Sequence, residues 1–444
     1  MTKTDLIIIG SGPGGYRAAV HAAKNGLQVV IIEQGPVGGT CLNAGCIPTK
    51  ALARNAEIID TMQKAGEFGL KDLSYNLDFA QVMARKNQVV ETLRQGVETL
   101  LATPGITLVR GKAHFTGVRE VAVGDDTYTA PHIIIATGST AKMLNIPGID
   151  HPKVVTSTEL LNVSTPPSRL VIVGAGVVGM EFASIFQSFG SEVTVVEYLK
   201  ECLPMLDGDI AKRLRQTMAK RGVNFIMQAA VKAVNDEGVV YERKEKTCTI
   251  PADMVLMATG RQPRTEGLDL KKTKVEQLPN GILIDEVYQT SCAGIFAIGD
   301  VNGRIMLAHA ATAQGLHVVN RILGQHDHMK LDIIPAAIFT NPEAAYVGVT
   351  EKECEDNDIP YICRKAYYRT NGKALAMGEP EGLVKLIFAG DDQMLAGCHA
   401  YGPHSADMVQ EFSALMAMDA TKEQLRDTVH IHPTIGELLQ DACW

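Results

Sequence analysis

A strand–glycine loop–helix–strand unit occurs twice in this chain of 444 residues, and it constrains the fold more than any other feature. The first copy has an apolar run at 5–9, the loop GSGPGG, helical spacing over 16–25, and QVVIIE ending in Glu33. The second copy begins RLVIVGAGVVG at 169 and closes with SEVTVVE, ending in Glu197. Such units predict parallel strands covered by helices, with a dinucleotide phosphate at the N-terminus of each helix.

Each glycine of the loop has its own role. Gly10 makes the tight turn, Gly12 lets the backbone approach a pyrophosphate, and Gly15 lets the helix pack on the strand. Glu33 lies 23 residues after Gly10, at a place that suits a ribose hydroxyl pair. The second loop repeats the pattern with Gly174, Gly176 and Gly179, and Glu197 again follows its first glycine by 23 residues. Glycines that serve only helix–strand packing are the alternative, which a motif repeated in register disfavours.

The two dinucleotide sites are predicted to hold different ligands. Glu197 would repel a 2′-phosphate, so the second site is predicted to bind NAD rather than NADP. Lys200 lies nearby and is interpreted as a solvated surface charge. The first copy leads directly into a pair of cysteines, so its ligand is predicted to be the electron acceptor beside them.

The repeat extends over whole domains, because each copy has a later apolar strand with the same ending, HIIIATGS at 132–139 and MVLMATGR at 254–261. The C-terminal part differs: LVKLIFA and CHAYG alternate like strands, an apolar helix is expected over 406–418, and no glycine loop occurs. We therefore predict an α/β fold with two Rossmann-like domains and a C-terminal α+β domain. The expected boundaries are 1–142 with 262–330, 143–261, and 331–444.

Composition limits the partners and the compartment. The formal net charge is −8 and no basic run interleaved with aromatics occurs, so nucleic acid is not expected as a partner. The N-terminal apolar run is short and leads into a glycine turn, and no stretch approaches the ~18 apolar residues that would span a bilayer, so no membrane association is expected. Nine cysteines, an odd number, argue against a secreted disulfide framework. The expected location is the cytoplasm.

The segment GGTCLNAGCIPTK at 38–50 is interpreted as a redox-active disulfide between Cys41 and Cys46. On one helix, residues five apart lie roughly 8–9 Å apart at Cα, beyond the ~7 Å that a disulfide bridges, so Cys41 is expected off the regular helix, with Pro48 distorting the turn around Cys46. A bridge here closes a very short loop, which makes it a poor staple and a better electron carrier. Unlinked buried thiols are the alternative. The remaining cysteines are expected to be reduced: Cys202, Cys248, Cys292, Cys354, Cys363, Cys398 and Cys443.

The C-terminal segment HIHPTIGE offers a candidate acid–base pair. Pro433 after His432 suits the first turn of a helix, and Glu437 from the second turn would reach one imidazole nitrogen and fix the tautomer. His432 is therefore a candidate general acid–base, against the alternative of an ordinary surface or core histidine. His430 is expected only to pack.

With these motifs in place, the sequence resembles the flavin-dependent pyridine nucleotide-disulfide oxidoreductases of class I, and most closely their dihydrolipoamide dehydrogenase branch. The resemblance covers nearly the whole chain and includes AIGDV at 297–301 and LAHAA at 307–311. It implies one non-covalent FAD per subunit, with the isoalloxazine over the disulfide, and NAD⁺/NADH on the other flavin face. Electrons would then pass from substrate to disulfide, flavin and NAD.

The resemblance also assigns individual residues. Asp300 matches the aspartate that binds the flavin ribityl chain, although by itself it could cap a helix, and Lys50 with Glu181 matches a pair beside flavin and nicotinamide that could otherwise be a surface pair. The catalytic set is predicted to be Cys41, Cys46, His432, Glu437, Lys50 and Glu181. The flavin-side set is Gly10, Gly12, Pro13, Gly14, Gly15, Glu33, Gly39, Thr40, Lys50, Ala113, Thr137, Gly138, Asp300 and Ala308. The NAD-side set is Gly174, Gly176, Val177, Val178, Gly179, Glu181, Glu197, Val231 and Gly260.

The implied activity is oxidation of protein-bound dihydrolipoamide with NAD⁺, in which His432 deprotonates a substrate thiol that attacks Cys41, and Cys46 carries the charge beneath the flavin. The implied assembly is a homodimer in which His432 and Glu437 of one subunit complete the site of the other. Expected partners are lipoyl domains of acyltransferase components or a glycine cleavage carrier protein.

Three other functions compete with this one. Glu197 and the segment GPHSADMV argue against a glutathione-type reductase, and the lone Cys443 argues against a metal-ion reductase with a C-terminal cysteine pair. A subunit that only docks on an acyltransferase core is disfavoured by the complete set of Cys41, Cys46, His432 and Glu437. The chain stops 12 residues after His432, so a longer tail is not expected to contribute to dimer contacts.

Overall fold

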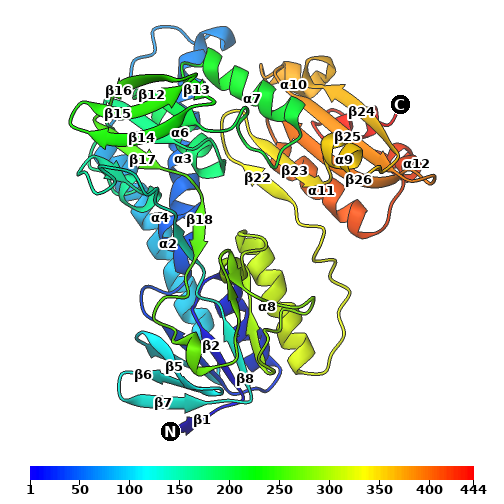
Figure 1. The fold of residues 1–444 in the computed structure, drawn as a ribbon. Coiled ribbons are helices and arrows are strands. Elements are labelled where there is room, and N and C mark those ends of the chain that lie inside the picture. Colours follow the sequence, from blue (N-terminus) through cyan, green and yellow to red (C-terminus); the bar gives the residue numbers. More distant parts are fainter.

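Two five-stranded parallel sheets share the order of four of their strands in the computed structural model, which describes residues 1–444 (Figure 1). The first sheet has the order β4–β3–β2–β8–β21 and the second β13–β12–β11–β17–β10. Their central strands are buried throughout, because the sequences LIII and LVIV present apolar side chains to both faces. In the second sheet, a helix over Val177–Ser188 packs on one face, but antiparallel strands over Ala230–Asn235 and Gly238–Arg243 pack on the other, so the predicted cover by helices alone is wrong there. The duplicated α/β architecture predicted from the two glycine loops is confirmed.

The first glycine-loop region holds the first sheet, a small antiparallel meander and long helices, and a later segment returns to the same sheet. Its elements are β1 (Thr2–Lys3), β2 (Leu6–Ile9), α1 (Pro13–Lys24), β3 (Val29–Glu33), α2 (Gly39–Ala44), α3 (Cys46–Lys64), η1 (Ala65–Phe68), α4 (Phe79–Leu101), β4 (Ile106–Arg110), β5 (Ala113–Gly117), β6 (Glu120–Val123), β7 (Asp126–Thr129) and β8 (His132–Ile135). The returning segment adds η2 (Leu270–Lys272), β19 (Gln277–Leu278), β20 (Gly281–Ile282), β21 (Ile295–Ala297), η3 (Gly299–Asn302) and α8 (Ala308–Ile322).

The second glycine-loop region is connected to the first by a two-stranded ribbon of β9 (Ser139–Ala141) and β18 (Arg261–Pro263), which pair antiparallel. One strand of the ribbon leaves the first region and the other returns to it, so both dinucleotide-binding units meet at this crossing. The elements between them are β10 (Val154–Val155), α5 (Ser157–Leu160), β11 (Arg169–Val173), α6 (Val177–Ser188), β12 (Glu192–Glu197), α7 (Gly208–Lys220), β13 (Asn224–Met227), β14 (Ala230–Asn235), β15 (Gly238–Arg243), β16 (Lys246–Pro251) and β17 (Met254–Met257).

The C-terminal part forms an antiparallel sheet of order β22–β23–β26–β25–β24, with helix α11 packed against it (Figure 1). This confirms the predicted α+β character. Its elements are β22 (Ala336–Ile338), β23 (Ala344–Gly348), α9 (Glu351–Asp356), β24 (Tyr361–Tyr367), η4 (Tyr368–Thr370), α10 (Gly372–Ala376), β25 (Leu383–Ala389), β26 (Met394–Tyr401), α11 (Ser405–Ala417), α12 (Lys422–Asp427) and α13 (Glu437–Asp441).

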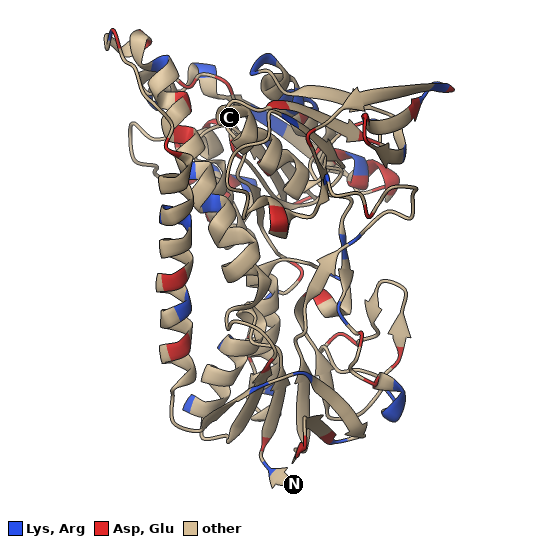
Figure 2. Cartoon of the chain, turned by 90° about the vertical axis from the view of Figure 1, so that its left-hand side faces the viewer, with Lys and Arg blue, Asp and Glu red and all other residues tan.

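Helix α3 joins the three parts. Its buried face, with Leu52 and Ile59, belongs to the same apolar core as Phe182 of α6 and Leu383 of β25. Because α3 begins at Cys46, this packing fixes one cysteine relative to both nucleotide units. Figure 2 shows acidic and basic residues alternating along the neighbouring long helix α4. Within α4, Glu91 and Arg94 form an ion pair of 2.8 Å. No helix of the structure combines the length and the apolar character needed to cross a bilayer.

Candidate active site

One cavity of about 1630 Å³ contains both glycine loops and the cysteine pair. Of the residues predicted to hold cofactors, all but one line it. The exception is Gly179, where a Cβ would lie 2.0 Å from the carbonyl oxygen of Gly174, so this glycine serves close packing behind the loop. The structure thus brings together the two predicted dinucleotide sites that lie far apart in the sequence.

The glycine loops have the same geometry in both copies. Gly10 and Gly174 have φ values of +104° and +105°, and a Cβ would lie 2.4 and 2.5 Å from the carbonyl oxygens of Ala136 and Ala258. Helix α1 begins at Pro13, earlier than predicted, because the loop glycines form its first turn and proline suits that position. Neither α1 nor α6 has a side-chain N-cap, so their first N–H groups remain available to a bound phosphate. The loops therefore fit the pyrophosphates of two dinucleotides.

The acid of each copy is fixed by backbone N–H groups. Glu33 accepts from Ser11 N at 2.8 Å and Gly35 N at 2.9 Å, and Glu197 accepts from Ala175 N at 2.5 Å and Leu199 N at 2.7 Å. Each carboxylate thus lies at the edge of its loop, facing the cavity. This placement suits the ribose contact predicted for both acids.

Cys41 lies on α2 and Cys46 opens α3, with a break in the helix at Gly45 between them. Gly45 has φ −148° and ψ −114°, and a Cβ there would lie 3.0 Å from the carbonyl oxygen of Thr40. The two cysteines therefore do not share one helix, as predicted, although Cys41 is helical in its own short segment. Both are free thiols in this structure, the state that the pair would have after reduction.

The two thiols are electrostatically unequal. A hydrogen bond from Cys41 and the nearby Lys50 ammonium lower the pKa of Cys46, against the opposing effect of burial. The same hydrogen bond and burial raise the pKa of Cys41. In the reduced pair Cys46 therefore ionises before Cys41, which stays a thiol and donates to it.

Lys50 and Glu181 form an ion pair between α3 and α6. The Nζ atom lies 2.8 and 2.9 Å from the two carboxylate oxygens, and the Glu181 side chain is 5 % exposed. Glu181 also accepts from the backbone N–H of Phe339 at 3.0 Å, and Nζ lies 4.6 Å from the centre of the Phe339 ring. The predicted pair therefore exists and lies in the cavity with Cys46.

Arg261 and Ser139 are site residues that the sequence pattern does not single out. Arg261 donates from Nε to Ser139 Oγ at 2.6 Å and from Nη2 to Ser139 O at 2.8 Å, and Ser139 Oγ in turn donates to Asp300. Burial lowers the pKa of Arg261, and Asp300 opposes this effect. The only sequence signal is position, since Arg261 directly follows Gly260 at the end of the second glycine-loop unit.

A second cavity of about 630 Å³ lies between α1 and α8 and reaches Cys41. Cys41 lines both cavities, whereas Cys46 lines only the larger one. The pair therefore lies between two separate spaces, and only Cys41 is open to both.

His432 and Glu437 lie outside both cavities. His432 Nδ1 lies 2.8 Å from Glu437 Oε1, and the imidazole is 80 % exposed. The hydrogen bond from Thr434 N and the contact with His432 lower the pKa of Glu437. The predicted contact is present, but the predicted helix is wrong: α13 begins at Glu437 and Pro433 precedes it in a loop, because Glu437 holds the N-terminal turn through Thr434 N at 2.8 Å.

His430 does more than pack. Its Nε2 lies 2.8 Å from Glu411 Oε1 and its Nδ1 lies 3.0 Å from the carbonyl oxygen of Thr428, which accepts from a protonated ring nitrogen. The His430 side chain is 6 % exposed, in contrast to His432. The two histidines thus form similar carboxylate contacts but differ in access to solvent.

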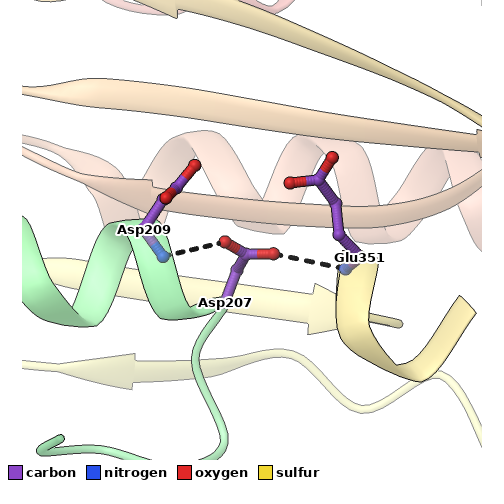
Figure 3. A group of neighbouring side chains, drawn as sticks. All are labelled: Asp207, Asp209 and Glu351. Carbon is purple, nitrogen blue, oxygen red and sulfur yellow. Dashed lines mark hydrogen bonds between the residues drawn. The ribbon is translucent and has the colours of Figure 1, made fainter. Parts of the chain in front are cut away.

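Three carboxylates meet away from the cavities, at the junction of α7, α9 and β25 (Figure 3). Asp207 accepts from the backbone N–H of Asp209 at 3.1 Å and of Glu351 at 3.2 Å, and so caps two helices. The buried Lys385 ammonium contacts all three, at 2.6 Å from Asp207 and 3.4 Å from Asp209. The group therefore carries its own counter-charge and fastens the second nucleotide unit to the C-terminal sheet.

Curated relatives match the chain over almost its full length. Dihydrolipoyl dehydrogenase of Bacillus subtilis is 36% identical, covering 99% of this chain and 97% of the relative. The mitochondrial dihydrolipoyl dehydrogenase of Pisum sativum is 37% identical, with 99% and 91% covered, and leghemoglobin reductase of Glycine max is 37% identical, with 99% and 87% covered. Among solved structures, the HOCl-induced flavoprotein disulfide reductase RclA of Escherichia coli has a TM-score of 0.88 at 30% identity, with 99% of both chains covered.

Two family descriptions divide the chain. Residues 4–315 match the pyridine nucleotide-disulphide oxidoreductases, and residues 334–443 match the dimerisation domain of the same family. The second match indicates a homodimer. The chain therefore belongs to the pyridine nucleotide-disulphide oxidoreductases, flavoenzymes that use FAD and NAD(H).

Proposed function

We propose that this enzyme is a dihydrolipoyl dehydrogenase, which oxidises protein-bound dihydrolipoamide to lipoamide and reduces NAD⁺ to NADH. The observation that carries the proposal is the position of the cysteine pair between two cavities, with Cys41 open to both and Cys46 only to the larger. A dithiol entering between α1 and α8 meets Cys41 first. Cys46 then lies on the nucleotide side.

The thiol exchange follows from this arrangement. A substrate thiolate attacks Sγ of Cys41 in the oxidised pair, and the Cys41–Cys46 bond breaks with Cys46 leaving as a thiolate. The second substrate thiol then attacks the substrate sulfur of the mixed disulfide, and its proton passes to Cys41, which leaves as a thiol while cyclic lipoamide forms. Two electrons now reside on the two cysteines. Cys46 is the better leaving group because its pKa is the lowered one.

His432 is proposed to take the proton of the attacking substrate thiol. Glu437 holds Nδ1, which leaves Nε2 free to accept that proton. Because His432 lines neither cavity of its own chain and is exposed, the histidine beside Cys41 is proposed to be His432 of the partner subunit. The homodimer would then share its two active sites.

The cavity residues fit both cofactors. The uncapped N-termini of α1 and α6 suit the pyrophosphates of the two dinucleotides, and Glu33 and Glu197 suit their ribose hydroxyls. Asp300 suits the hydroxyl groups of the flavin ribityl chain. When bound, FAD supplies the two-electron step between the cysteines and NAD⁺. The Lys50 ammonium lies near Cys46 and stabilises the negative charge that Cys46 carries after reduction. Glu181 holds this ammonium in position through an ion pair.

A second candidate is reduction of another disulfide or of a metal ion. The similarity to RclA favours it, because that flavoprotein disulfide reductase has also been solved as a Cu(II) complex, with a TM-score of 0.88 to this chain. Against it, the lone C-terminal thiol Cys443 is buried, and burial raises its pKa to about 11, which makes it a poor electron relay. The names of the curated relatives support the lipoamide reaction.

A substrate comparison tests the proposal. The purified yellow dimer is mixed with NAD⁺ and either dihydrolipoamide or reduced glutathione, and NADH formation is followed together with the long-wavelength absorption of a thiolate next to oxidised flavin. We expect both signals with dihydrolipoamide and neither with glutathione. Turnover with glutathione, or NADH-dependent reduction of Cu(II) that is faster than lipoamide reduction, would establish the second candidate instead. Lipoyl domains are the proposed natural substrates.

A further inference from the structure

The groove between α1 and α8 has an apolar floor at one end and a basic rim toward the other. Pro13, Cys41, Ala308, His309 and Ala313 line both cavities, so they mark the junction at the N-terminal ends of the two helices. Further along the groove, its apolar lining consists of Val20, Leu316 and Met329. A neutral alkyl chain fits this lining, because its methylenes find apolar partners there and leave no charge unpaired.

Arg17, His21 and Lys24 form a basic stripe on α1. They stand at i, i+4 and i+7, and so share one face of the helix. All three line only the second cavity, and no aspartate or glutamate lines it. Counted from Pro13 at 1.5 Å per residue, Arg17 lies about 6 Å and Lys24 about 16 Å along the helix from the junction. The two positive charges therefore lie at different distances along the groove, one near the junction and one toward its outer end.

None of these groups is neutralised by the chain itself. The Arg17 guanidinium lies 5.5 Å from the ring centre of Tyr16 and forms no ion pair, and Lys24 has no ion pair either. His21 Nε2 lies 2.6 Å from Asn320 Oδ1, a neutral partner. Both Arg17 and Lys24 are exposed. In a protein of net charge −8, an unpaired basic stripe beside the reactive thiol needs an explanation other than general composition.

We propose that the basic stripe Arg17–His21–Lys24 docks an acidic face of the carrier domain whose lipoyl-lysine arm reaches Cys41 along the groove. This inference rests on the proposed function, and it names the partner surface that the enzyme recognises. The arm itself is neutral and follows the apolar lining, while the acidic residues of the carrier meet the stripe one to three helical turns along α1 from the junction.

Because the charges of the basic stripe are exposed to solvent, dissolved salt should weaken their interaction with the carrier domain. Such contacts act mainly on encounter and depend on ionic strength, since the Debye length is about 10 Å at 0.1 M salt. The test compares the holoenzyme dimer with R17E/K24E, using three substrates: a dihydrolipoylated carrier domain with an acidic surface, free dihydrolipoamide, and free dihydrolipoate. K212E/K220E on α7 is the matched control, because it makes the same charge change at two exposed lysines without ion pairs.

We expect R17E/K24E to raise the KM for the carrier domain about tenfold or more relative to the KM for dihydrolipoamide, and to abolish the salt dependence of the wild-type KM for the carrier. The control is expected to leave that ratio within about twofold. An equal effect on carrier and dihydrolipoamide, or an equal effect of the control, overturns the proposal. A change confined to dihydrolipoate overturns it too, since the stripe would then serve a small anion.

The milder R17Q/K24Q keeps the test valid if charge reversal prevents folding, with an expected rise of about threefold in the same KM ratio. If the wild-type enzyme oxidises dihydrolipoamide and R17E/K24E has an unchanged KM for the carrier domain, only the docking proposal is refuted. Wild-type enzyme that oxidises none of the three substrates refutes the proposed function, and the docking proposal with it.

Discussion

Cys46 depends on two neighbours for its charge, the Cys41 thiol that donates to it and the Lys50 ammonium. Both lower its pKa, while burial and Glu181 raise it. The sum of these opposing effects sets the pKa of Cys46. It therefore determines how far the pH can fall below the ordinary cysteine pKa of about 8.5 before the thiolate is lost. A thiolate is lost as the pH falls through its own pKa, so a lowered value extends reactivity toward neutral pH.

Replacing Lys50 by Met should shift this balance. The variant loses the ammonium and leaves the Glu181 carboxylate, so the pKa of Cys46 should rise from about 7 by about one unit and alkylation at pH 7 should slow about fivefold. The measurement is iodoacetamide labelling of the Cys46 peptide against pH in a Cys41→Ser background, read by mass spectrometry. Lys50→Arg keeps the charge and is the control. An unchanged midpoint in Lys50→Met would show that the Lys50 ammonium does not stabilise the Cys46 thiolate.

His432 and His430 offer a matched pair for testing acid–base catalysis. Each contacts one glutamate at 2.8 Å, but only His432 is exposed. His432→Gln should slow dihydrolipoamide-dependent NAD⁺ reduction by ~10²–10⁴ and leave NADH oxidation by artificial dyes intact, because only the dithiol step needs the base. His430→Gln should change neither rate by a comparable factor. Loss of both activities in His432→Gln would contradict the assigned role.

At the scale of elements, the crossing of α1 and α8 positions the thiol groove. A Cβ on Gly14 would lie 2.8 Å from the carbonyl oxygen of Ala311, and one on Gly315 would lie 2.8 Å from the carbonyl oxygen of Gly14. Both helices line the groove beside Cys41. Gly14 and Gly315 therefore allow the two helices to pack closely, in addition to the role of the loop glycines in binding a phosphate.

Gly14→Ala should destabilise the enzyme by about 1–3 kcal/mol, because the methyl group forces the two helices apart. Gly96→Ala is the matched control in the exposed middle of α4, where a Cβ meets nothing within 4 Å, and it should stabilise by about 0.5–1 kcal/mol. Urea denaturation midpoints at one protein concentration measure both. The idea fails if the two alanines move the midpoint in the same direction.

At the scale of the whole molecule, the single chain lacks one part of its proposed site. Cys41 and Cys46 lie between the two cavities, whereas His432 lies on an exposed loop outside both. The dimerisation domain that carries His432 extends over residues 334–443. A two-fold dimer would place the loop of each subunit against the groove of the other.

Mixed dimers test this arrangement. Cys41→Ser and His432→Gln subunits are each inactive alone, but a mixed dimer would contain one site with both wild-type residues. Random reassortment of equal amounts should therefore restore about a quarter of wild-type activity, since half of the dimers are mixed and each has one working site of two. Catalysis by His432 within its own chain would give no restoration. Size-exclusion chromatography of the mixture confirms that dimers have formed.

The sequence by itself determined the duplicated nucleotide fold and its acids, because strand, loop and helix follow one another within about 25 residues and local spacing fixes such units. It also separated Cys41 from the helix of Cys46, since helix geometry forbids a bridge between residues five apart. The domain boundaries, the cytoplasmic location and the roles of the site residues stay predictions.

Only the tertiary structure decided which distant groups meet. Lys50 contacts Glu181 across 131 residues, Arg261 reaches Ser139 across 122, and Cys41 lies open to a groove formed by two helices from opposite ends of the flavin-side unit. The start of α13 at Glu437 depended on a contact with Thr434 that the position of Pro433 does not reveal. Spacing within a segment fixes local geometry, whereas contacts between segments depend on how the packed elements are oriented.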